Sequence, residues 1–341
     1  MIRFECDYTE GAIPEIIENL AKYNLEQTPG YGVDYHCEHA RELIKEACGR
    51  DDVDVHFLVG GTQTNATVIA SILRPHQAVI APDSGHINGH ECGAIEATGH
   101  KVLALPPTDA KISADQIYAY CKEHFDDPTR EHVLQPGMAY ISQPTECGTL
   151  YSKQELLDIK KVCQEFGVCL YIDGARLGYG FAASTNDATL EDIAAIADVF
   201  YIGGTKVGAM FGEAVVICND KYKLDFRYHI KQRGGMLAKG RMLGIQFETL
   251  FQDGKYYEIS KHAVAMADKL RFAFAAKGYD FLIKSYTNQI FVIMNNDKLN
   301  ELSQNVSFLP WGPVDETRSA ARFVTSWATK EEAVDELISL L

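Results

Sequence analysis

Short apolar runs alternate with segments of helical period through the middle of the chain, and this alternation constrains the fold more than any other sequence feature. The apolar runs predict seven strands, at 55–59, 78–82, 101–105, 138–142, 168–172, 198–202 and 214–218. The segments between them predict helices near 63–73, 88–98, 113–125, 153–166 and 189–197. Strands that alternate with helices form a mostly parallel sheet covered on both faces. The sequence therefore predicts an α/β domain with a mostly parallel, seven-stranded sheet.

The segment 153–166 carries the clearest helix signal. Ser152, with Glu155 three residues later, forms a capping box at its start. Apolar residues then recur at helical spacing, and Gly167 follows as a stop. We expect the helix to begin after Ser152 and to end at Gly167.

The 341 residues suggest about two domains, at roughly 150 residues per domain. Residues 236–276 have the spacing of long helices, and strand candidates follow at 289–294 and 322–326, before a terminal helix. This order predicts a smaller α+β domain after the large one. We expect an N-terminal arm at 1–30, a large domain at 31–235 and a small domain at 236–341.

Acidic residues outnumber basic ones, 47 against 32, which gives a net charge of −15. Such a surface repels phosphate backbones and anionic lipids, so we expect neither nucleic acid nor a membrane as partner. The nine cysteines are odd in number and include no Cys-x-x-Cys, and the first residues lack the apolar core of a signal peptide. We therefore expect a cytoplasmic protein whose cysteines are reduced and mostly fill the core.

Polar and glycine-rich segments follow five of the predicted strands, at 60–65, 83–86, 143–146, 173–176 and 203–206. The carboxyl ends of parallel strands meet at one edge of the sheet, where such folds bind their ligands. The opposite edge has ordinary turns, such as 74–77. One ligand bound by all five strand ends is the economical interpretation.

Each strand end taken alone has an ordinary alternative. Gly61 and Thr62 open a helix whose N–H groups suit a phosphate, or they form a plain N-cap turn. Asp173 holds a cation, or it caps a helix or pairs with Arg176. Lys206 stands among small residues that let a flat group approach, or it is a solvated loop lysine.

His86 taken alone is a satisfied surface or core histidine. The His, Cys and Glu residues at 36–39 and 86–92 do not match metal-ligand spacing, so we expect no metal. No P-loop and no Gly-x-Gly-x-x-Gly fingerprint occurs. A phosphate cradle, an aromatic ring, a buried carboxylate and an isolated lysine together describe a site for pyridoxal phosphate.

Eight segments also occur in an order typical of one enzyme family. They are Asp7-Tyr8-Thr9-Glu10-Gly11 with Pro14, Tyr31-Gly32, Gly61-Thr62-x-x-Asn65, His86-Ile87 with Glu91, Asp173-Gly174-Ala175-Arg176, Lys206-x-Gly208-Ala209, Gly234-Gly235-Met236 and Arg322-Phe-Val-Thr325-Ser-Trp327. Over nearly its whole length the chain resembles the threonine aldolase / β-eliminating lyase family of fold type I pyridoxal-phosphate enzymes. The resemblance implies that fold for the large domain, with a smaller C-terminal α+β domain.

The resemblance also implies roles at the cofactor. Lys206 would form the Schiff base with the cofactor aldehyde, and Asp173 would pair with the ring nitrogen. His86 would stack on the ring and serve in proton transfer. Gly61 and Thr62 would bind the phosphate.

Further basic residues receive roles from the same resemblance. Arg233 or Lys239 would assist at the phosphate. Arg176 and Arg322 would grip the substrate carboxylate, because the planar guanidinium meets a carboxylate with two hydrogen bonds. Cys6 stands near them, where the family usually has serine.

Two segments depart from the family pattern. The family commonly carries a second histidine after the fourth strand, but 143–146 contains none, and Glu146 could replace it as a base. The lysine segment 203–206 reads Gly-Gly-Thr-Lys where Ser-Lys-Gly is commoner. These changes indicate a divergent branch and put threonine itself in doubt as the substrate.

The resemblance implies a lyase that cleaves a β-hydroxy-α-amino acid, of threonine or allo-threonine type, to glycine and an aldehyde. The alternative is β-elimination from another amino acid. Racemase or transaminase chemistry, a non-catalytic scaffold and a nucleotide-dependent oxidoreductase are weaker interpretations. Active sites of this fold type usually lie at a dimer interface, so we expect a homodimer or homotetramer in which Tyr31 reaches the site of the other subunit.

Overall fold

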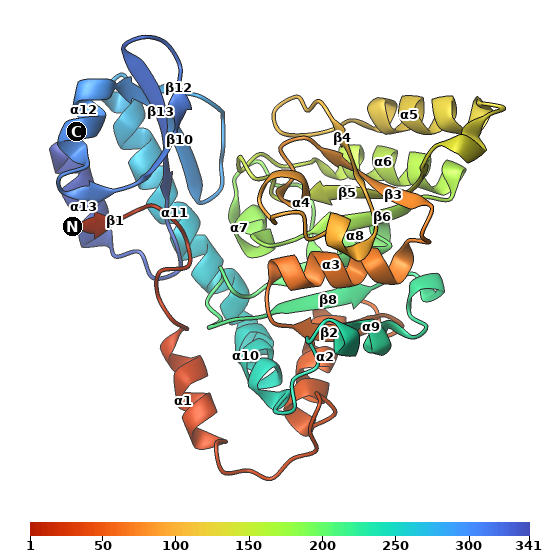
Figure 1. Ribbon diagram of the computed structural model, residues 1–341. Coiled ribbons are helices and arrows are strands. Elements are labelled where there is room, and N and C mark those ends of the chain that lie inside the picture. Colours follow the sequence, from red (N-terminus) through yellow and green to blue (C-terminus); the bar gives the residue numbers. More distant parts are fainter.

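A seven-stranded sheet forms the centre of the larger lobe in the computed structural model, which describes residues 1–341 (Figure 1). Its strands are β2 (Asp54–Leu58), β3 (Gln77–Pro82), β4 (Val102–Leu105), β5 (Gln135–Ser142), β6 (Cys169–Asp173), β7 (Val199–Gly203) and β8 (Glu213–Ile217). They lie in the order β2-β8-β7-β6-β5-β3-β4, and β8 alone runs antiparallel to its neighbours. The predicted mostly parallel sheet is confirmed, and every strand end lies within three residues of its prediction.

Helices cover both faces of this sheet and bury a separate apolar cluster on each. The larger cluster, of 44 residues, joins one face to helices α2 (Tyr35–Ala47), α5 (Ala114–Asp126), α6 (Lys153–Phe166), α8 (Leu190–Ile196) and α10 (Arg241–Phe251). The smaller cluster, of 19 residues, joins the other face to α3 (Gly61–Ile72) and α9 (Phe226–Gln232). The two-sided cover explains why the strands are continuously apolar rather than alternating.

Local sequence signals account for some helix ends and fail at others. In α6 the Ser152 hydroxyl accepts from the Glu155 N–H, and Gly167 ends the helix at a φ of 67°, as predicted. The helix predicted at 88–98 is wrong. The chain forms only the four-residue α4 (His86–Gly89) and a 3₁₀ turn at Glu96–Thr98, because Cys92 and Gly93 adopt positive φ angles that no α-helix accommodates.

The smaller lobe is built around a second, antiparallel sheet (Figure 1). Its strands are β9 (Asp280–Phe281), β10 (Gln289–Asn295), β12 (Leu309–Pro313) and β13 (Arg318–Val324), and its helices are α12 (Asn296–Leu302) and α13 (Glu331–Leu340). The long helix α11 (Lys255–Ala276) leads into this lobe, which has its own core of 14 buried residues. The predicted strands at 289–294 and 322–326 correspond to β10 and to the end of β13.

The N-terminal residues belong to both lobes. Strand β1 (Ile2–Arg3) pairs in parallel with β11 (Val306–Ser307) of the smaller lobe. The chain then passes to α1 (Pro14–Lys22), which packs beside α10 at the foot of the larger lobe (Figure 1). The domain limits of 1–30, 31–235 and 236–341 remain a prediction.

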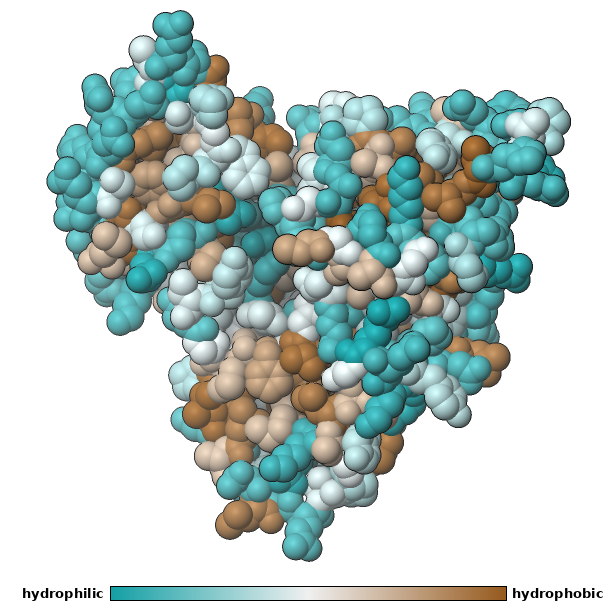
Figure 2. Space-filling model, in the orientation of Figure 1, coloured by the Kyte–Doolittle hydropathy of each residue, from teal (hydrophilic) through white to brown (hydrophobic).

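The surface is hollowed between the two lobes (Figure 2). None of the helices has the length and apolar character that crossing a membrane requires.

All nine cysteines are free, and six of them are buried.

Glycines let the ends of β6 and β7 approach closely. A Cβ atom on Gly174 would lie 2.0 Å from the Tyr201 carbonyl oxygen, and one on Gly203 would lie 2.2 Å from that of Ala175. Both distances are far below any real contact, so neither position accepts a side chain without a backbone shift. These two glycines therefore bring Asp173, at the end of β6, beside the loop that follows β7.

Candidate active site

The polar segments predicted to follow five strands do meet at one edge of the large sheet. Hydrogen bonds join four of them: the His86 N–H donates to Glu146 at 2.9 Å, and the Asn65 amide donates to Asp173 at 3.2 Å. Glu91 links the two pairs, because it accepts from Asn65 at 2.7 Å and contacts the His86 ring at 2.8 Å. The fifth segment ends at Lys206, close enough to Asp173 for the two charges to interact.

Asp173 is only 4% exposed, yet both of its carboxylate oxygens are fully hydrogen-bonded. Oδ1 accepts from the Tyr201 hydroxyl at 2.5 Å and from the Ala175 N–H at 3.0 Å. Oδ2 accepts from the Tyr140 hydroxyl at 2.6 Å and from Asn65 at 3.2 Å. The four donors compensate the buried charge, so Asp173 can be a fixed anion beside the ligand.

Lys206 is partly buried and forms no ion pair. Its loop is fixed from two sides: the Tyr179 hydroxyl donates to the Lys206 carbonyl at 2.6 Å, and the Gly204 N–H donates to Glu213 at 2.9 Å. Burial lowers the pKa of Lys206, and the nearby charge of Arg176 lowers it further. Burial also raises the pKa of Glu213 to about 7. The lysine amine is therefore biased towards the neutral, nucleophilic form.

The first turn of α3 is open for an anion. Its N-cap Gly60 has no side chain that could satisfy the free N–H groups of Gly61 and Thr62. Gln63 in the same turn donates to the Arg233 carbonyl at 3.1 Å, which ties Arg233 to this helix end. The buried Nε of Arg233 has no hydrogen-bond partner. Free N–H groups, the helix dipole and an unsatisfied guanidinium fit a phosphate. The alternative basic residue, Lys239, is exposed and its side chain makes no hydrogen bond or ion pair.

The two arginines predicted to hold a substrate carboxylate differ in what they contact. Arg176 is held by fully buried Asp7, whose carboxylate accepts from its Nε at 2.7 Å and from Nη2 at 3.0 Å. Only Nη1 of Arg176 has no hydrogen-bond partner. Sequence reasoning missed this pairing, because Asp7 lies 169 residues away from Arg176.

Arg322 has no carboxylate partner at all. Its Nη1 donates to the Gln289 amide oxygen at 3.2 Å and its Nη2 to the Glu5 carbonyl at 3.3 Å, while its buried Nε has no partner. The guanidinium lies 5.6 Å from the centre of the Trp311 ring, over its face. Burial lowers the pKa of Arg322. A cation this desolvated and unpaired is suited to bind an anion that arrives from outside. The charge of Arg322 also reaches the thiol of Cys6, whose pKa burial raises.

Glu146 occupies the place that the sequence assigned to a replacement base. Its Oε1 accepts from the Ser142 hydroxyl at 2.6 Å and from the His86 N–H at 2.9 Å. Its Oε2 is buried and has no partner, and burial raises the pKa of this carboxyl group. The Gln289 side chain joins Glu146 to Arg322, because its amide nitrogen donates to the Glu146 carbonyl at 3.3 Å.

The His86 ring is 39% exposed, and its Nδ1 atom is fixed by the fully buried Glu91 at 2.8 Å. One nitrogen is thus anchored while part of the ring remains accessible. This arrangement is compatible with the predicted stacking role.

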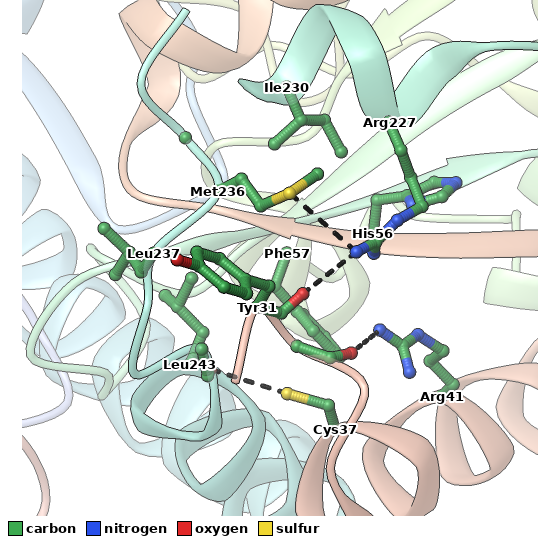
Figure 3. A pocket seen from close by; sticks show the side chains of 13 residues that line it. Tyr31, Cys37, Arg41, His56, Phe57, Arg227, Ile230, Met236, Leu237 and Leu243 are labelled. Atoms are coloured by element: carbon green, nitrogen blue, oxygen red, sulfur yellow. Dashed lines mark hydrogen bonds between the residues drawn. The ribbon is translucent and has the colours of Figure 1, made fainter. Parts of the chain in front are cut away.

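Tyr31 lies in a different place from the residues above. It lines a small pocket with Arg227, Met236 and partly buried His56 (Figure 3), and its ring is 4.8 Å from the Lys231 ammonium. Its side chain is 48% exposed, at a positive φ of 61°. The expectation that Tyr31 serves the site of a second subunit remains a prediction.

Comparison with solved structures defines the class of fold. The chain superposes on a threonine aldolase from Leishmania major with a TM-score of 0.97 and 43% identity, covering 100% of this chain and 98% of that one. A mutant aspartate aminotransferase from Thermus thermophilus gives a TM-score of 0.71 over 99% of this chain and 95% of that one, at 14% identity, which supports the fold alone. The architecture is that of fold type I pyridoxal-phosphate enzymes, as predicted.

Sequence comparison gives the family. The β-eliminating lyase family model matches residues 4–297. A low specificity L-threonine aldolase from a Pseudomonas species is 30% identical over 98% of this chain and 95% of its own length. The chain belongs to the β-eliminating lyase family, a family of pyridoxal-phosphate-dependent enzymes. It is a threonine aldolase-like lyase, and the predicted resemblance is confirmed.

The pair formed by Asp7 and Arg176 makes the free energy of unfolding depend on pH in the acidic range. Burial alone would raise the pKa of Asp7, but the charges of Arg176 and Lys206 outweigh it and hold that pKa below its usual value. The stabilisation that ionised Asp7 provides is therefore complete above about pH 4. It is lost as the pH falls through the lowered pKa of Asp7 in the folded protein. At neutral pH, Asp7→Asn leaves a buried guanidinium unpaired and should cost about 3 kcal/mol in urea-induced unfolding.

Asp126→Asn provides the matched control, because it breaks only an exposed pair with Lys122 and should leave the urea midpoint unchanged. Equal unfolding midpoints for Asp7→Asn and wild type at neutral pH would contradict the assignment of the Asp7–Arg176 pair.

Proposed function

We propose that this chain is a pyridoxal-phosphate-dependent aldolase. It cleaves a β-hydroxy-α-amino acid, of threonine or allo-threonine type, to glycine and an aldehyde. One observation supports this substrate class most directly. Arg322 is a partly buried cation without a carboxylate, and Gln289 joins it to Glu146, which has a buried oxygen without a donor. A β-hydroxy-α-amino acid supplies both missing groups, a carboxylate and a hydroxyl.

The residues present fit pyridoxal phosphate at its phosphate, its ring nitrogen and its aldehyde. The open turn at Gly61 and Thr62, with the unsatisfied Nε of Arg233, suits the phosphate. Asp173 is a fixed buried anion for the ring nitrogen, and Lys206 is a lysine biased towards the neutral amine. When bound, the cofactor supplies a ring that accepts the electron pair released at the substrate Cα atom.

The chain's own residues then have these tasks. Arg322 binds the substrate carboxylate, and the remaining Nη1 of Arg176 assists, since Asp7 holds the rest of that guanidinium in place. His86 stacks against the cofactor ring. Glu146, in its ionised form, removes the proton of the β-hydroxyl group. The Cα–Cβ bond breaks, the former hydroxyl carbon leaves as the aldehyde, and a proton delivered to Cα completes glycine.

Subunit assembly follows as part of the same proposal. Tyr31 is half exposed beside the basic side chains Arg227 and Lys231, and none of its hydrogen bonds or ring contacts involves Lys206 or Asp173. We infer a homodimer or homotetramer in which this face meets the active site of a neighbouring subunit.

The identity of the products distinguishes aldol cleavage from β-elimination. The purified protein, loaded with pyridoxal phosphate and given threonine, allo-threonine and phenylserine, should release glycine and the matching aldehyde in equal amounts. Lys206→Ala should release neither, whereas Lys161→Ala, which removes an exposed lysine on α6, should match the wild type. Ammonia and a keto acid in place of glycine would establish β-elimination and overturn the aldolase assignment.

Glu146→Gln tests the base. Because burial raises the pKa of Glu146, kcat should rise with pH through a value above the ordinary range of a glutamate. The variant should bind cofactor normally, lose this limb of the pH profile and lower kcat by roughly 10²–10⁴-fold. Glu165→Gln, at an exposed position on α6, should behave as the wild type. An unchanged pH profile in Glu146→Gln would remove Glu146 from this role.

A further inference from the structure

Three tyrosines form a row across neighbouring strands beneath Asp173: Tyr140 on β5, Tyr171 on β6 and Tyr201 on β7. Each is at most 1% exposed. Their ring centres are 5.8 Å apart between Tyr140 and Tyr171, and 6.5 Å apart between Tyr171 and Tyr201. Polar hydroxyl groups at three adjacent core positions require partners, and those partners show what the row does.

The two outer tyrosines point their hydroxyl groups at the same carboxylate. Tyr201 donates to one oxygen of Asp173 at 2.5 Å, and Tyr140 donates to the other at 2.6 Å. These distances lie in the range typical of an O–H donor facing an anion. The middle tyrosine differs, because the Tyr171 hydroxyl donates at 2.8 Å to the Asn65 amide oxygen and not to Asp173.

Both outer tyrosines remain donors throughout the working pH range. Burial raises the pKa of Tyr140 and of Tyr201 well above the ordinary value, and the neighbouring charge of Asp173 raises both further. A phenol that stays protonated keeps its O–H group, and each of these two phenols therefore remains a donor to the Asp173 carboxylate. The negative charge of Asp173 is therefore shared permanently with two phenols.

Sharing that charge has a consequence for the cofactor. An anion that already accepts two strong hydrogen bonds attracts a further proton less than a free one does. We propose that Tyr140 and Tyr201 are positioning residues that fix the Asp173 carboxylate and weaken its hold on the proton of the cofactor ring nitrogen. This inference rests on the proposed function, because it requires pyridoxal phosphate at Asp173.

The test is a pH titration of the visible absorbance band of the cofactor-loaded enzyme. Removing one phenol hydroxyl leaves more charge on Asp173, so the carboxylate attracts the proton of the ring nitrogen more strongly. A ring nitrogen that shares its proton more with Asp173 carries less positive charge, and the carboxylate itself is more negative. Both effects raise the pKa of the nitrogen that joins Lys206 to the cofactor. Tyr201→Phe and Tyr140→Phe should each raise the midpoint of the titration by about half a pH unit or more.

Tyr171→Phe is the matched control, since it removes an equally buried hydroxyl from the same row without touching Asp173. Its midpoint should shift less than those of the two outer variants, because Tyr171 reaches Asp173 only through Asn65, while thermal unfolding shows whether all three variants fold. If one outer variant fails to fold, the other carries the test alone. Equal midpoints in all three variants, or an equal shift in all three, would overturn the inference and leave the proposed function intact. A wild-type protein that shows no visible band would overturn the proposed function itself, and the inference with it.

Discussion

The hydrogen bonds to one buried carboxylate hold the candidate site together. Asp173 ends the central strand β6 and accepts from four donors that come from α3, β5, β7 and its own turn. A buried carboxylate with fewer donors would be costly to keep charged. Because the four donors belong to separate elements, the anion can stay charged only when the sheet and its neighbouring helix are correctly assembled. Fold and site chemistry therefore depend on the same contacts.

The charge of the whole protein and the charge of the site have opposite signs. The chain carries a net charge of −15, yet several cations near the site are unpaired or only partly paired: Lys206, Arg233, Arg322 and one nitrogen of Arg176. Unpaired cations that are partly removed from water are unfavourable without an anion. A ligand with a phosphate and a substrate with a carboxylate would supply the missing charges. The residues that are costly in the folded state are therefore those that would bind the ligands.

Most of the large sheet could be predicted from the sequence because buried parallel strands are continuous apolar runs, and because polar groups gather where those strands end. The same rule located Lys206, Asp173 and His86. It could not reveal that Tyr140 and Tyr201 face Asp173, since a tyrosine inside an apolar run resembles any other core residue. The sequence also did not predict the break in the helix expected at 88–98, because Cys92 adopts a left-handed conformation that carries no sequence signal.

The central claim is that pyridoxal phosphate binds at the meeting point of the five strand ends, through Lys206. The most direct measurement is to load the protein with pyridoxal phosphate, reduce it with borohydride, digest it and locate the pyridoxyl group by mass spectrometry. The account predicts a single modified lysine, Lys206, in the peptide that contains Gly203 and Gly204. A pyridoxyl group on any other lysine, or on none, would contradict it.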